Sequence, residues 1–233
     1  IDLNEKLNFP LLYPTSDKDY GDTRKSLWKV IKDAIESGEI NEVYDGRNDN
    51  FLQDSINKII GKNISGVVNI NIKDLYGSSW KPSDNEPQTF AKSSEILAYR
   101  TKGVWFFDKK HSELKYRLLG LMPIGKNLKD DDATGGTGYF WLWYPQIREI
   151  LSKHKVFNDK NNNNRISFDD LLVNRRFSSF IYKYNNVYGD REIKEYIVKR
   201  DNETDYQHQL RLLMESERIK KEILDFEIDM WGY

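Results

Sequence analysis

The strongest hydrophobic pattern lies in the middle of the chain, where residues 96–125 predict a β-hairpin. From Leu114 to Leu118, apolar residues alternate with Lys115 and Arg117, which is the pattern of a half-buried strand. The six polar residues DKKHSE precede this stretch and form the expected connection. A connection of that length does not fix the register by itself. We therefore place the hairpin at the core of a sheet and leave its register open.

The first strand of this hairpin carries a short aromatic run. Trp105 and Phe107 fall on one face of the strand, and Val104 and Phe106 fall on the other. A strand that is apolar on both faces is expected to be covered on both sides. Core packing is the first interpretation of this run. An aromatic platform for a sugar or a peptide is the alternative.

Helical and strand patterns follow one another irregularly along the rest of the chain. The predicted helices are one capped by Thr23 that runs to Ile35 and stops at Ser37-Gly38, one around Leu52–Ile60, one that starts at Pro145, and Phe168–Tyr184. The predicted strands are Ile40–Tyr44, Val68–Ile72 and Tyr139–Tyr144. No βαβ unit repeats, so the sequence predicts the α+β class, with a central, mostly antiparallel sheet and flanking helices.

The N-terminal residues have a pattern of their own. Residues 1–22 carry Pro10 and Pro14 among apolar side chains, which favours an extended path. We therefore expect an extended arm, 1–22, followed by a single α+β domain, 23–233. The arm is expected to lie on its own domain or on a partner subunit. Its candidate interface residues are Ile1, Leu3, Leu7, Pro10, Leu11, Tyr13 and Pro14.

The last helix is predicted over Tyr206–Met230 and is amphipathic. One face of this helix carries Leu212, Ile219, Ile223, Phe226 and Met230. Such a face either docks on the sheet, which is the usual fate of a terminal helix, or meets another subunit.

Composition narrows the class of protein. The 233 residues include 36 Lys and Arg against 37 Asp and Glu, and the net charge of −1 gives no electrostatic footprint for nucleic acid or an anionic membrane. No cysteine is present, so disulfides, a thiolate nucleophile and a cysteine metal site are excluded. No apolar run approaches the ~18–20 residues that span a bilayer. The chain begins at Ile1 without Met or a signal peptide, and we expect a processed or trimmed product.

One segment has the spacing of a calcium loop. Asp159, Asn161, Asn163, Ser167 and Asp170 occupy positions 1, 3, 5, 9 and 12 of an EF-hand-type loop. Position 6 is Asn164 instead of glycine, and position 12 is aspartate instead of the bidentate glutamate. The alternative is an Asn-rich turn followed by a capping box, Ser167 to Asp170, at the start of a helix.

The sequence shows no catalytic constellation. His111, His154 and His208 are far apart, so a zinc site is poorly supported. No nucleophile elbow, Walker loop or dinucleotide fingerprint occurs, and no cofactor is expected. Arg175 and Arg176 could bind a phosphate or a carboxylate. Local pairing with Asp169 or Asp170, or stacking on an aromatic side chain, is the alternative. Motifs alone indicate an α+β domain without visible catalytic residues.

Several segments, in order along almost the whole chain, together resemble one family. They are Ile1–Pro14, Val104–Lys109, Arg117–Pro123, Phe140–Pro145, Ser167–Leu171, Arg176–Lys183, Asn186–Tyr188, Leu213–Lys220 and Asp229–Trp231. The set resembles the gliding motility protein GldN, called PorN in non-gliding bacteria.

The resemblance implies a periplasmic, non-catalytic component of the type IX secretion system of Bacteroidota. Members of the family join a lipoprotein, GldK or PorK, in a ring beneath the outer membrane, and they are linked to the GldL–GldM motor. No catalytic residues are carried over from the family. The competing class is a periplasmic protein or enzyme that acts on cell-wall glycan. It would place Trp80, Trp105, Trp141 and Trp143 on an open platform, with two carboxylates across a cleft.

Overall fold

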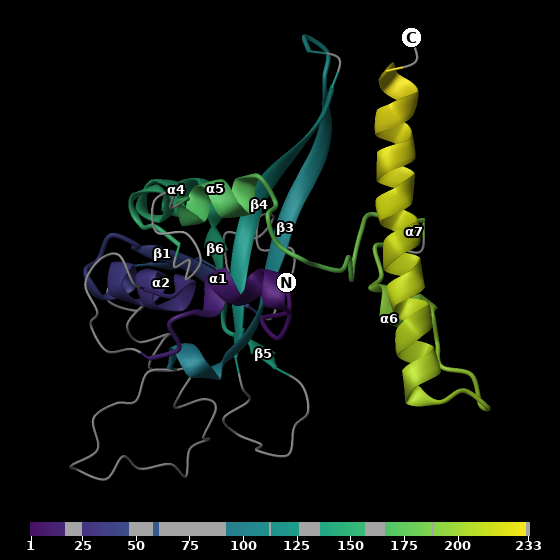
Figure 1. The fold of residues 1–233 in the computed structure, drawn as a ribbon, viewed down its shortest axis with the longest axis horizontal. Coiled ribbons are helices and arrows are strands. Elements are labelled where there is room, and N and C mark those ends of the chain that lie inside the picture. Colours follow the sequence, from purple (N-terminus) through teal and green to yellow (C-terminus); the bar gives the residue numbers. More distant parts are fainter. Residues whose placement is uncertain are drawn as a thin grey trace. The chain divides into compact units, whose positions relative to one another are not determined.

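The computed structural model describes residues 1–16, 25–46, 58–60, 92–111, 113–125, 136–156, 166–187 and 189–231 (Figure 1). The chain forms two compact units. Unit 1 contains Ile1–Val104 and Arg117–Ser178, and unit 2 contains Trp105–Tyr116 and Ser179–Tyr233. Each unit is described by itself. The predicted boundary after residue 22 falls in 17–24, outside the described residues, so it stays a prediction.

Six strands form a sheet in the order β2-β1-β6-β4-β3, and β5 also pairs with β4. Their bounds are β1 Glu42–Asp45, β2 Lys58–Ile60, β3 Ile96–Asp108, β4 Glu113–Gly125, β5 Thr137–Gly138 and β6 Phe140–Trp143. Strand β6 pairs antiparallel with β1, where Tyr44 faces Trp141, and with β4, where Gly120 faces Trp143. Strands β1 and β2, and strands β4 and β5, are also antiparallel. The predicted α+β class with a mostly antiparallel sheet is confirmed.

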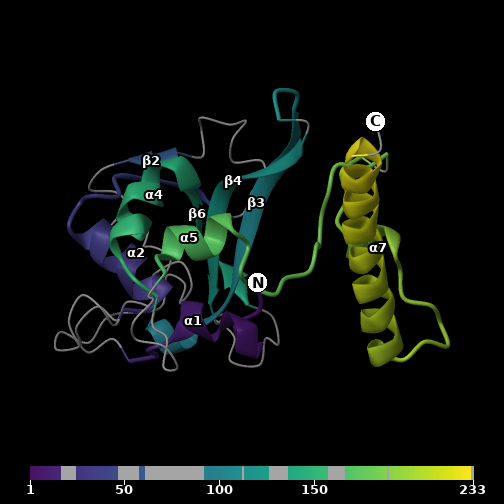
Figure 2. The same cartoon turned by 45° about the horizontal axis from the view of Figure 1, so that its top comes forward.

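Helices accompany this sheet, and α2, α4 and α5 lie together beside β6 and β4 in two views (Figures 1 and 2). The helices of unit 1 are η1 Lys6–Asn8, α1 Phe9–Leu12, α2 Leu27–Glu36, η3 Ser93–Glu95, α4 Tyr144–Lys153 and α5 Phe168–Val173. Unit 2 contains α6 Ile193–Tyr196 and α7 Asp205–Trp231. Helix α7 confirms the terminal helix predicted over Tyr206–Met230.

Helix α2 begins three residues later than Thr23 would place it. Its cap is Ser26, whose hydroxyl accepts a hydrogen bond from the backbone N–H of Lys29 at 3.1 Å. Thr23 lies outside the described residues. The helix ends at Ser37, followed by Gly38 at a φ of 79°, as predicted. Its buried side chains are Leu27, Trp28, Val30, Ile31 and Ala34, and the ring of Trp28 packs 6.2 Å from that of Phe140.

Strand β6 is covered on both faces, as predicted. Phe140, Trp141 and Leu142 are almost fully buried. Trp141 packs with Met122 in a core cluster that Tyr44 and Trp143 border. The strand ends at Trp143, and α4 begins at the next residue, with Pro145 in its first turn. Strand and helix therefore join without an intervening loop.

The predicted hairpin is present as β3 and β4, but its aromatic run is not core. The buried side chains of these strands are Ile96, Tyr99, Leu118, Leu121 and Met122. Trp105, Phe106 and Phe107 are only half-buried, and Val104 is 44% exposed. Strand β6 pairs with β4 only at Gly120 and Leu121, so the sheet supports the inner part of the hairpin. The expectation that the aromatic run is covered on both sides is wrong.

Two predicted helices are also wrong in part. The helix expected over Phe168–Tyr184 ends at Val173, where Asn174 caps it and Arg175 adopts a φ of 51°, outside helical geometry. Residues 58–60, expected in a helix, form β2 because pairing with β1 overrides the helical spacing. The strand expected at Val68–Ile72 lies outside the described residues.

Among the described residues 1–16, a helical stretch interrupts the predicted extended path. The N-terminal amine of Ile1 donates to the carbonyl of Tyr99 at 2.9 Å, and the N–H of Leu3 donates to that of Leu97 at 3.0 Å. Residues 6–12 are helical instead of extended, since Pro10 stands in the first turn of α1, where a missing N–H costs nothing.

Unit 2 is built on α7. The hydroxyl of the fully buried Ser216 accepts a hydrogen bond from the N–H of Ile181 at 2.6 Å. Lys220 donates to the carbonyl of Ser179 at 2.6 Å. These bonds fix residues 179–181 against α7 without helix or strand pairing. Across the described residues, no helix is both long enough and apolar enough to cross a membrane.

Candidate interaction surfaces

The N-terminal segment presents a buried face and an exposed face. Ile1, Leu3 and Leu11 are buried within unit 1, so three of the seven candidate interface residues belong to the core. Leu7 is 60% exposed and Tyr13 is 39% exposed, while Pro10 and Pro14 are half-buried. Of the seven candidates, Leu7 and Tyr13 are therefore the exposed ones.

Asn8 fastens this segment to a distant part of unit 1. Its side-chain amide donates to the carbonyl of Asp2 at 2.6 Å and to that of Ser178 at 2.9 Å. Its carbonyl oxygen accepts from the N–H of Ser178 at 2.8 Å. The side chain is fully buried. The backbone next to Leu7 is therefore held in place by these hydrogen bonds.

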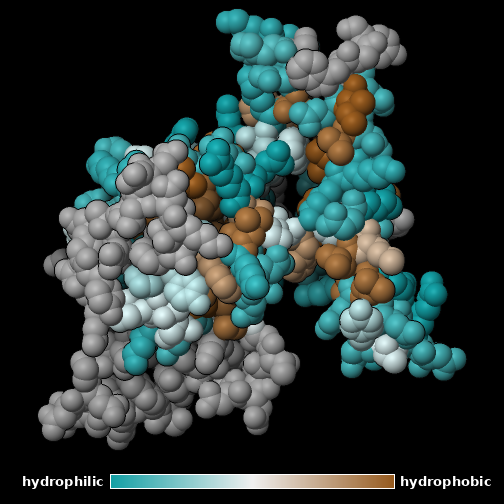
Figure 3. Space-filling view, in the orientation of Figure 1, coloured by the Kyte–Doolittle hydropathy of each residue, from teal (hydrophilic) through white to brown (hydrophobic). Residues whose placement is uncertain are grey.

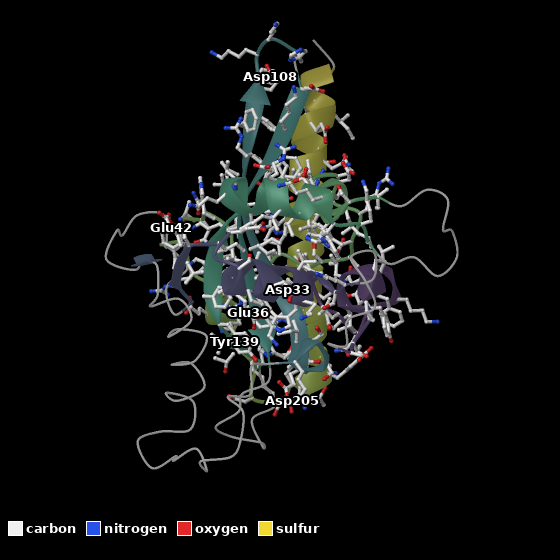
Figure 4. The ribbon with its side chains drawn as sticks, turned by 90° about the vertical axis from the view of Figure 1, so that its left-hand side faces the viewer. Asp33, Glu36, Glu42, Asp108, Tyr139 and Asp205 are labelled. Atoms are coloured by element: carbon white, nitrogen blue, oxygen red, sulfur yellow. The ribbon has the colours of Figure 1, made fainter. Side chains whose placement is uncertain are left out.

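Charged residues gather at the end of the hairpin, where Figure 4 labels Asp108. Nζ of Lys115 lies 2.7 Å from Oδ2 of Asp108 and 2.8 Å from Oε1 of Glu113. Nδ1 of His111 lies 2.8 Å from the same Asp108 oxygen. Lys115, and after it His111, holds the pKa of Asp108 well below its ordinary value.

Asp108, His111 and Glu113 are metal-ligating residue types, and their ligand atoms lie within 4.8 Å of one another. The ammonium of Lys115 contacts both carboxylates. A cation at this place would have to displace that ammonium, so the arrangement is that of an ion-paired turn. His111, the one histidine of this cluster, is exposed.

The most buried charged group in unit 1 whose partners are described is Asp169. Its carboxylate accepts a hydrogen bond from the hydroxyl of Tyr144 at 2.8 Å. Nε of Arg148 lies 3.2 Å from both of its oxygens. Burial, and then Asp169, raises the pKa of Tyr144 well above its ordinary value. Asp169 thus pairs with Arg148, and the cluster ties α4 to α5. Arg176 acts on the neighbouring carboxylate, Asp170, whose pKa it helps to lower after Ser167 and Lys155.

Three of the five calcium candidates, Asp159, Asn161 and Asn163, lie in 157–165, outside the described residues. The two remaining candidates form the capping box named as the alternative. The hydroxyl of Ser167 accepts from the N–H of Asp170 at 3.0 Å and donates to Oδ2 of Asp170 at 2.7 Å. The hydroxyl of Ser167 and Oδ2 of Asp170 are thus already engaged at the start of α5.

Of the tryptophans that the structure describes, Trp141 is too deeply buried to take part in an open glycan platform. Trp141 is fully buried in the core cluster, and Trp143 is half-buried beside it. Trp80 lies outside the described residues. Trp105 is half-buried in unit 2, where its ring packs 5.2 Å from that of Tyr116.

Helix α7 has a second apolar face that the sequence analysis missed. Its exposed members are Tyr206, Leu210, Leu213, Met214, Leu224 and Ile228. Figure 3 shows hydrophobic side chains on this helix in two groups with hydrophilic ones between them. The sequence pattern that could have revealed this face is a second set of apolar residues at helical spacing, separate from the set assigned to the docking face. This second set is 206, 210, 213, 224 and 228.

Comparison with known proteins places the chain in a family. No curated protein matches the chain. A family model described as "Gliding motility associated protein GldN" matches residues 1–232. The match covers both units, including the helix that carries the exposed apolar face. The chain therefore belongs to the GldN family of gliding motility associated proteins.

Proposed function

We propose that this chain is a non-catalytic structural subunit of the type IX secretion and gliding machinery. In this proposal it assembles with a GldK/PorK-type lipoprotein into a periplasmic ring beneath the outer membrane and is linked to the GldL–GldM motor. The observation that carries the proposal is the family match over residues 1–232. The resemblance found in the sequence supplies the ring, the compartment and the partners.

The surface of the described residues supports a role in assembly. The side chains of Leu7, Phe180 and Val198 are each more than half exposed, as are several on α7. Scattered exposed apolar residues are ordinary on a protein surface, but an apolar row on one helix face is typical of an interaction site. Net charge near zero leaves shape and apolar area as the main sources of partner recognition.

The N-terminal surface is the proposed contact with the lipoprotein. Leu7 precedes Asn8 in the chain. The side-chain amide of Asn8 donates two hydrogen bonds that hold this part of the segment in place. The ring of Tyr13 is held edge-on against that of Phe9, with 5.3 Å between the centroids. Side chains held in place before binding lose less entropy on association. Leu7 and Tyr13 are therefore suited to act as anchors.

Deleting residues 1–14 would be a poor test of this contact, because it removes Leu3, Asn8 and Leu11 from the core of unit 1. The sharper experiment replaces Leu7 and Tyr13 by serine and measures co-purification with the lipoprotein. We expect binding to weaken by at least about tenfold, which corresponds to ~1.4 kcal/mol. Val187→Ser, at a residue that is 94% exposed in unit 2, is the matched control.

Three results would count against the proposal. Unchanged co-purification of the Leu7→Ser/Tyr13→Ser variant would argue against the proposed N-terminal contact with the lipoprotein. Failure of the chain to form a large particle with the lipoprotein would argue against its role as a ring subunit. Release of fragments from peptidoglycan by the chain alone would favour the wall-enzyme class instead.

A further inference from the structure

Strand β3 is an edge of the sheet, and part of this edge already pairs with a short stretch of the same chain. The sheet order among the described residues ends at β3, next to β4, and the N-terminus lies beside this strand (Figures 1 and 2). The N–H of Leu3 donates to the carbonyl of Leu97 at 3.0 Å, and the N–H of Tyr99 donates to that of Ile1 at 2.9 Å. The outer side of β3 therefore accepts an antiparallel strand.

This pairing with residues 1–3 stops at Tyr99, and the edge beyond it is open. In a strand, the N–H and C=O of every second residue point to the same side. Leu97 and Tyr99 direct theirs to residues 1–3, so Thr101 and Gly103 direct theirs to the same outer side. Within the described part of the chain, no hydrogen bond reaches these groups of Thr101 or Gly103. A row of open backbone donors and acceptors is a template for a further strand.

The open stretch of the edge within unit 1 is Arg100–Val104. Gly103 is exposed, Val104 is 44% exposed, and Thr101 and Lys102 are half-buried. The stretch is as long as an ordinary short strand of about 5 residues. A glycine inside a strand often marks a place where another backbone approaches closely. The edge is thus accessible over the length that one added strand needs.

The strand already in place indicates which side chains the edge accepts. In Ile1–Leu3 the first and third residues are buried, and the middle residue, Asp2, faces Ala98. The face of β3 that carries Ala98 next carries two basic residues, Arg100 and Lys102. Opposite charges on directly facing residues stabilise a strand pair, and like charges destabilise it. An added strand is therefore favoured when acidic residues alternate with apolar ones.

We propose that the outer edge of β3 at Arg100–Val104 binds an extended segment of a partner protein in which apolar residues alternate with aspartate or glutamate. The segment adds an antiparallel strand to the sheet and continues the line of residues 1–3. Its apolar residues lie opposite Thr101 and Gly103, and an acidic residue lies opposite Lys102. The main-chain hydrogen bonds supply the affinity, and the side chains at alternate positions supply the specificity.

Charge disfavours a second copy of this chain as the occupant. The edges of two copies would pair antiparallel about a two-fold axis. An axis that brings Thr101 opposite Gly103 also sets Lys102 opposite Lys102 of the second copy. Like charges at directly facing positions destabilise such a pair, and a lysine on an edge strand is a common guard against edge-to-edge association. The edge therefore discriminates between an acidic strand and its own copy.

This binding edge goes beyond the proposed ring function. It uses other residues than Leu7 and Tyr13, which carry the proposed contact with the lipoprotein. Its tests need only the purified full chain and a peptide. Failure of one proposal therefore leaves the other standing.

Hydrogen exchange of the free chain tests whether the edge is open. The amides of Thr101 and Gly103 should exchange at least about tenfold faster than the amide of Tyr99. Tyr99 is the internal control, because it lies on the same side of the same strand and donates to Ile1. Equal protection of all three amides would show that the edge is covered within the chain and would overturn the proposal.

A tethered strand tests what the edge binds. Four residues, Val-Asp-Val-Asp, added in front of Ile1 would continue residues 1–3 past Thr101 and Gly103. Tethering gives a high effective concentration, so a weak intrinsic affinity does not hide the pairing. We expect the amides of Thr101 and Gly103 to exchange at least about tenfold slower than in the unextended chain. Val-Lys-Val-Lys at the same place is the matched control and should change their exchange by less than about twofold.

A free peptide tests binding from another molecule. The probe is acetyl-Val-Asp-Val-Asp-Val-amide at millimolar concentration, titrated into the full chain and followed by NMR. Thr101→Pro removes the outward N–H and leaves the ladder with β4 intact, and it should raise the dissociation constant at least about tenfold. Thr101→Val keeps the N–H with a side chain of the same shape and should stay within about twofold of the wild type.

Four further outcomes would overturn the proposal. Equal protection by the aspartate and lysine extensions would remove the preference for an acidic strand. Protection by neither extension would exclude strand addition at this edge. Peptide binding that Thr101→Pro leaves unchanged would place the peptide elsewhere. Protection of Thr101 that grows with the concentration of the free chain would assign the edge to a second copy.

Discussion

Asn8 and Ser178, 170 positions apart, are joined by two hydrogen bonds of 2.9 and 2.8 Å. The amide side chain of Asn8 thus pairs with the backbone of Ser178 as a neighbouring strand would. Ser178 is the last residue of unit 1 before the chain passes into unit 2. The bond pair fixes the N-terminal segment and this exit point to one another.

Replacing Asn8 by alanine should therefore destabilise unit 1. The variant leaves the N–H and the carbonyl of Ser178 without the bonds that they make to Asn8, and we expect a loss of about 2–3 kcal/mol in the free energy of unfolding. The measurement is urea denaturation, in which the dependence of the unfolding free energy on urea concentration should match that of the wild-type chain. Asn4→Ala, which removes only an exposed contact with Asp2, is the control. A loss no larger than that of the control would contradict this assignment.

The capping box at the start of α5 should be worth a measurable amount. Ser167→Ala removes the hydroxyl that accepts the N–H of Asp170, and caps of this kind contribute about 1 kcal/mol. Ser152→Ala, which deletes an exposed hydroxyl near the end of α4, should change stability by less than about 0.5 kcal/mol. Equal losses in thermal melts would argue against the box.

Addition of calcium separates the two interpretations of the Asn-rich segment. If Ser167 serves only as a cap, the melting temperature of the wild-type chain should not move when calcium is added. A rise with calcium that disappears in Asp159→Ala would show a calcium site instead.

The hairpin end should respond to acid through Asp108. Its pKa is lowered in the folded chain, first by Lys115 and then by His111. A lowered folded pKa means that this stabilisation is fully present above the ordinary aspartate value of about 3.9 and is lost as the pH falls through the folded value. Lys115→Gln should raise the pKa of Asp108 toward its ordinary value in a carboxyl NMR titration.

Lys109→Gln is the control for that titration, because it removes an exposed lysine next to Asp108 in the sequence. An Asp108 titration that moves equally in both variants would show that general charge, and not the Lys115 contact at 2.7 Å, sets the shift.

Gly125 should not accept a side chain. A Cβ at this position would overlap the ring and hydroxyl of Tyr139. We expect Gly125→Ala to cost about 1–3 kcal/mol through overpacking. In a double-mutant cycle Tyr139→Leu should recover part of that loss, because the smaller side chain makes room. Strictly additive losses would mean that the strain arises elsewhere.

Much of the fold could be predicted because its signals are local. The alternation in Leu114–Leu118, the stop at Gly38 and the apolar block Tyr139–Tyr144 each specify an element without reference to the rest of the chain. Strand β2 could not be predicted in this way. Ile59 and Ile60 have helical spacing with their neighbours, and only pairing with β1 makes them a strand.

Burial was harder to predict than secondary structure. Trp105 and Trp141 are the same residue type in similar aromatic runs, but Trp141 is fully buried and Trp105 is half-buried. Trp105 lies near the end of β3, an edge strand, whereas Trp141 lies in β6, between β1 and β4. No local pattern records that difference. The candidate interface residues of the N-terminal segment likewise differ in burial, since Leu3 lies in the core and Leu7 lies at the surface.

The direct joint between β6 and α4 has a consequence for how this family can vary. Trp143 ends the strand and Tyr144 starts the helix, so no spare residue can absorb a change of length. One inserted residue would rotate α4 by about 100° about its axis. Ile147, Ile150 and Leu151 would then swing out of the core together. Natural relatives should therefore keep the spacing between these aromatic and aliphatic positions constant, however much their other segments grow or shrink.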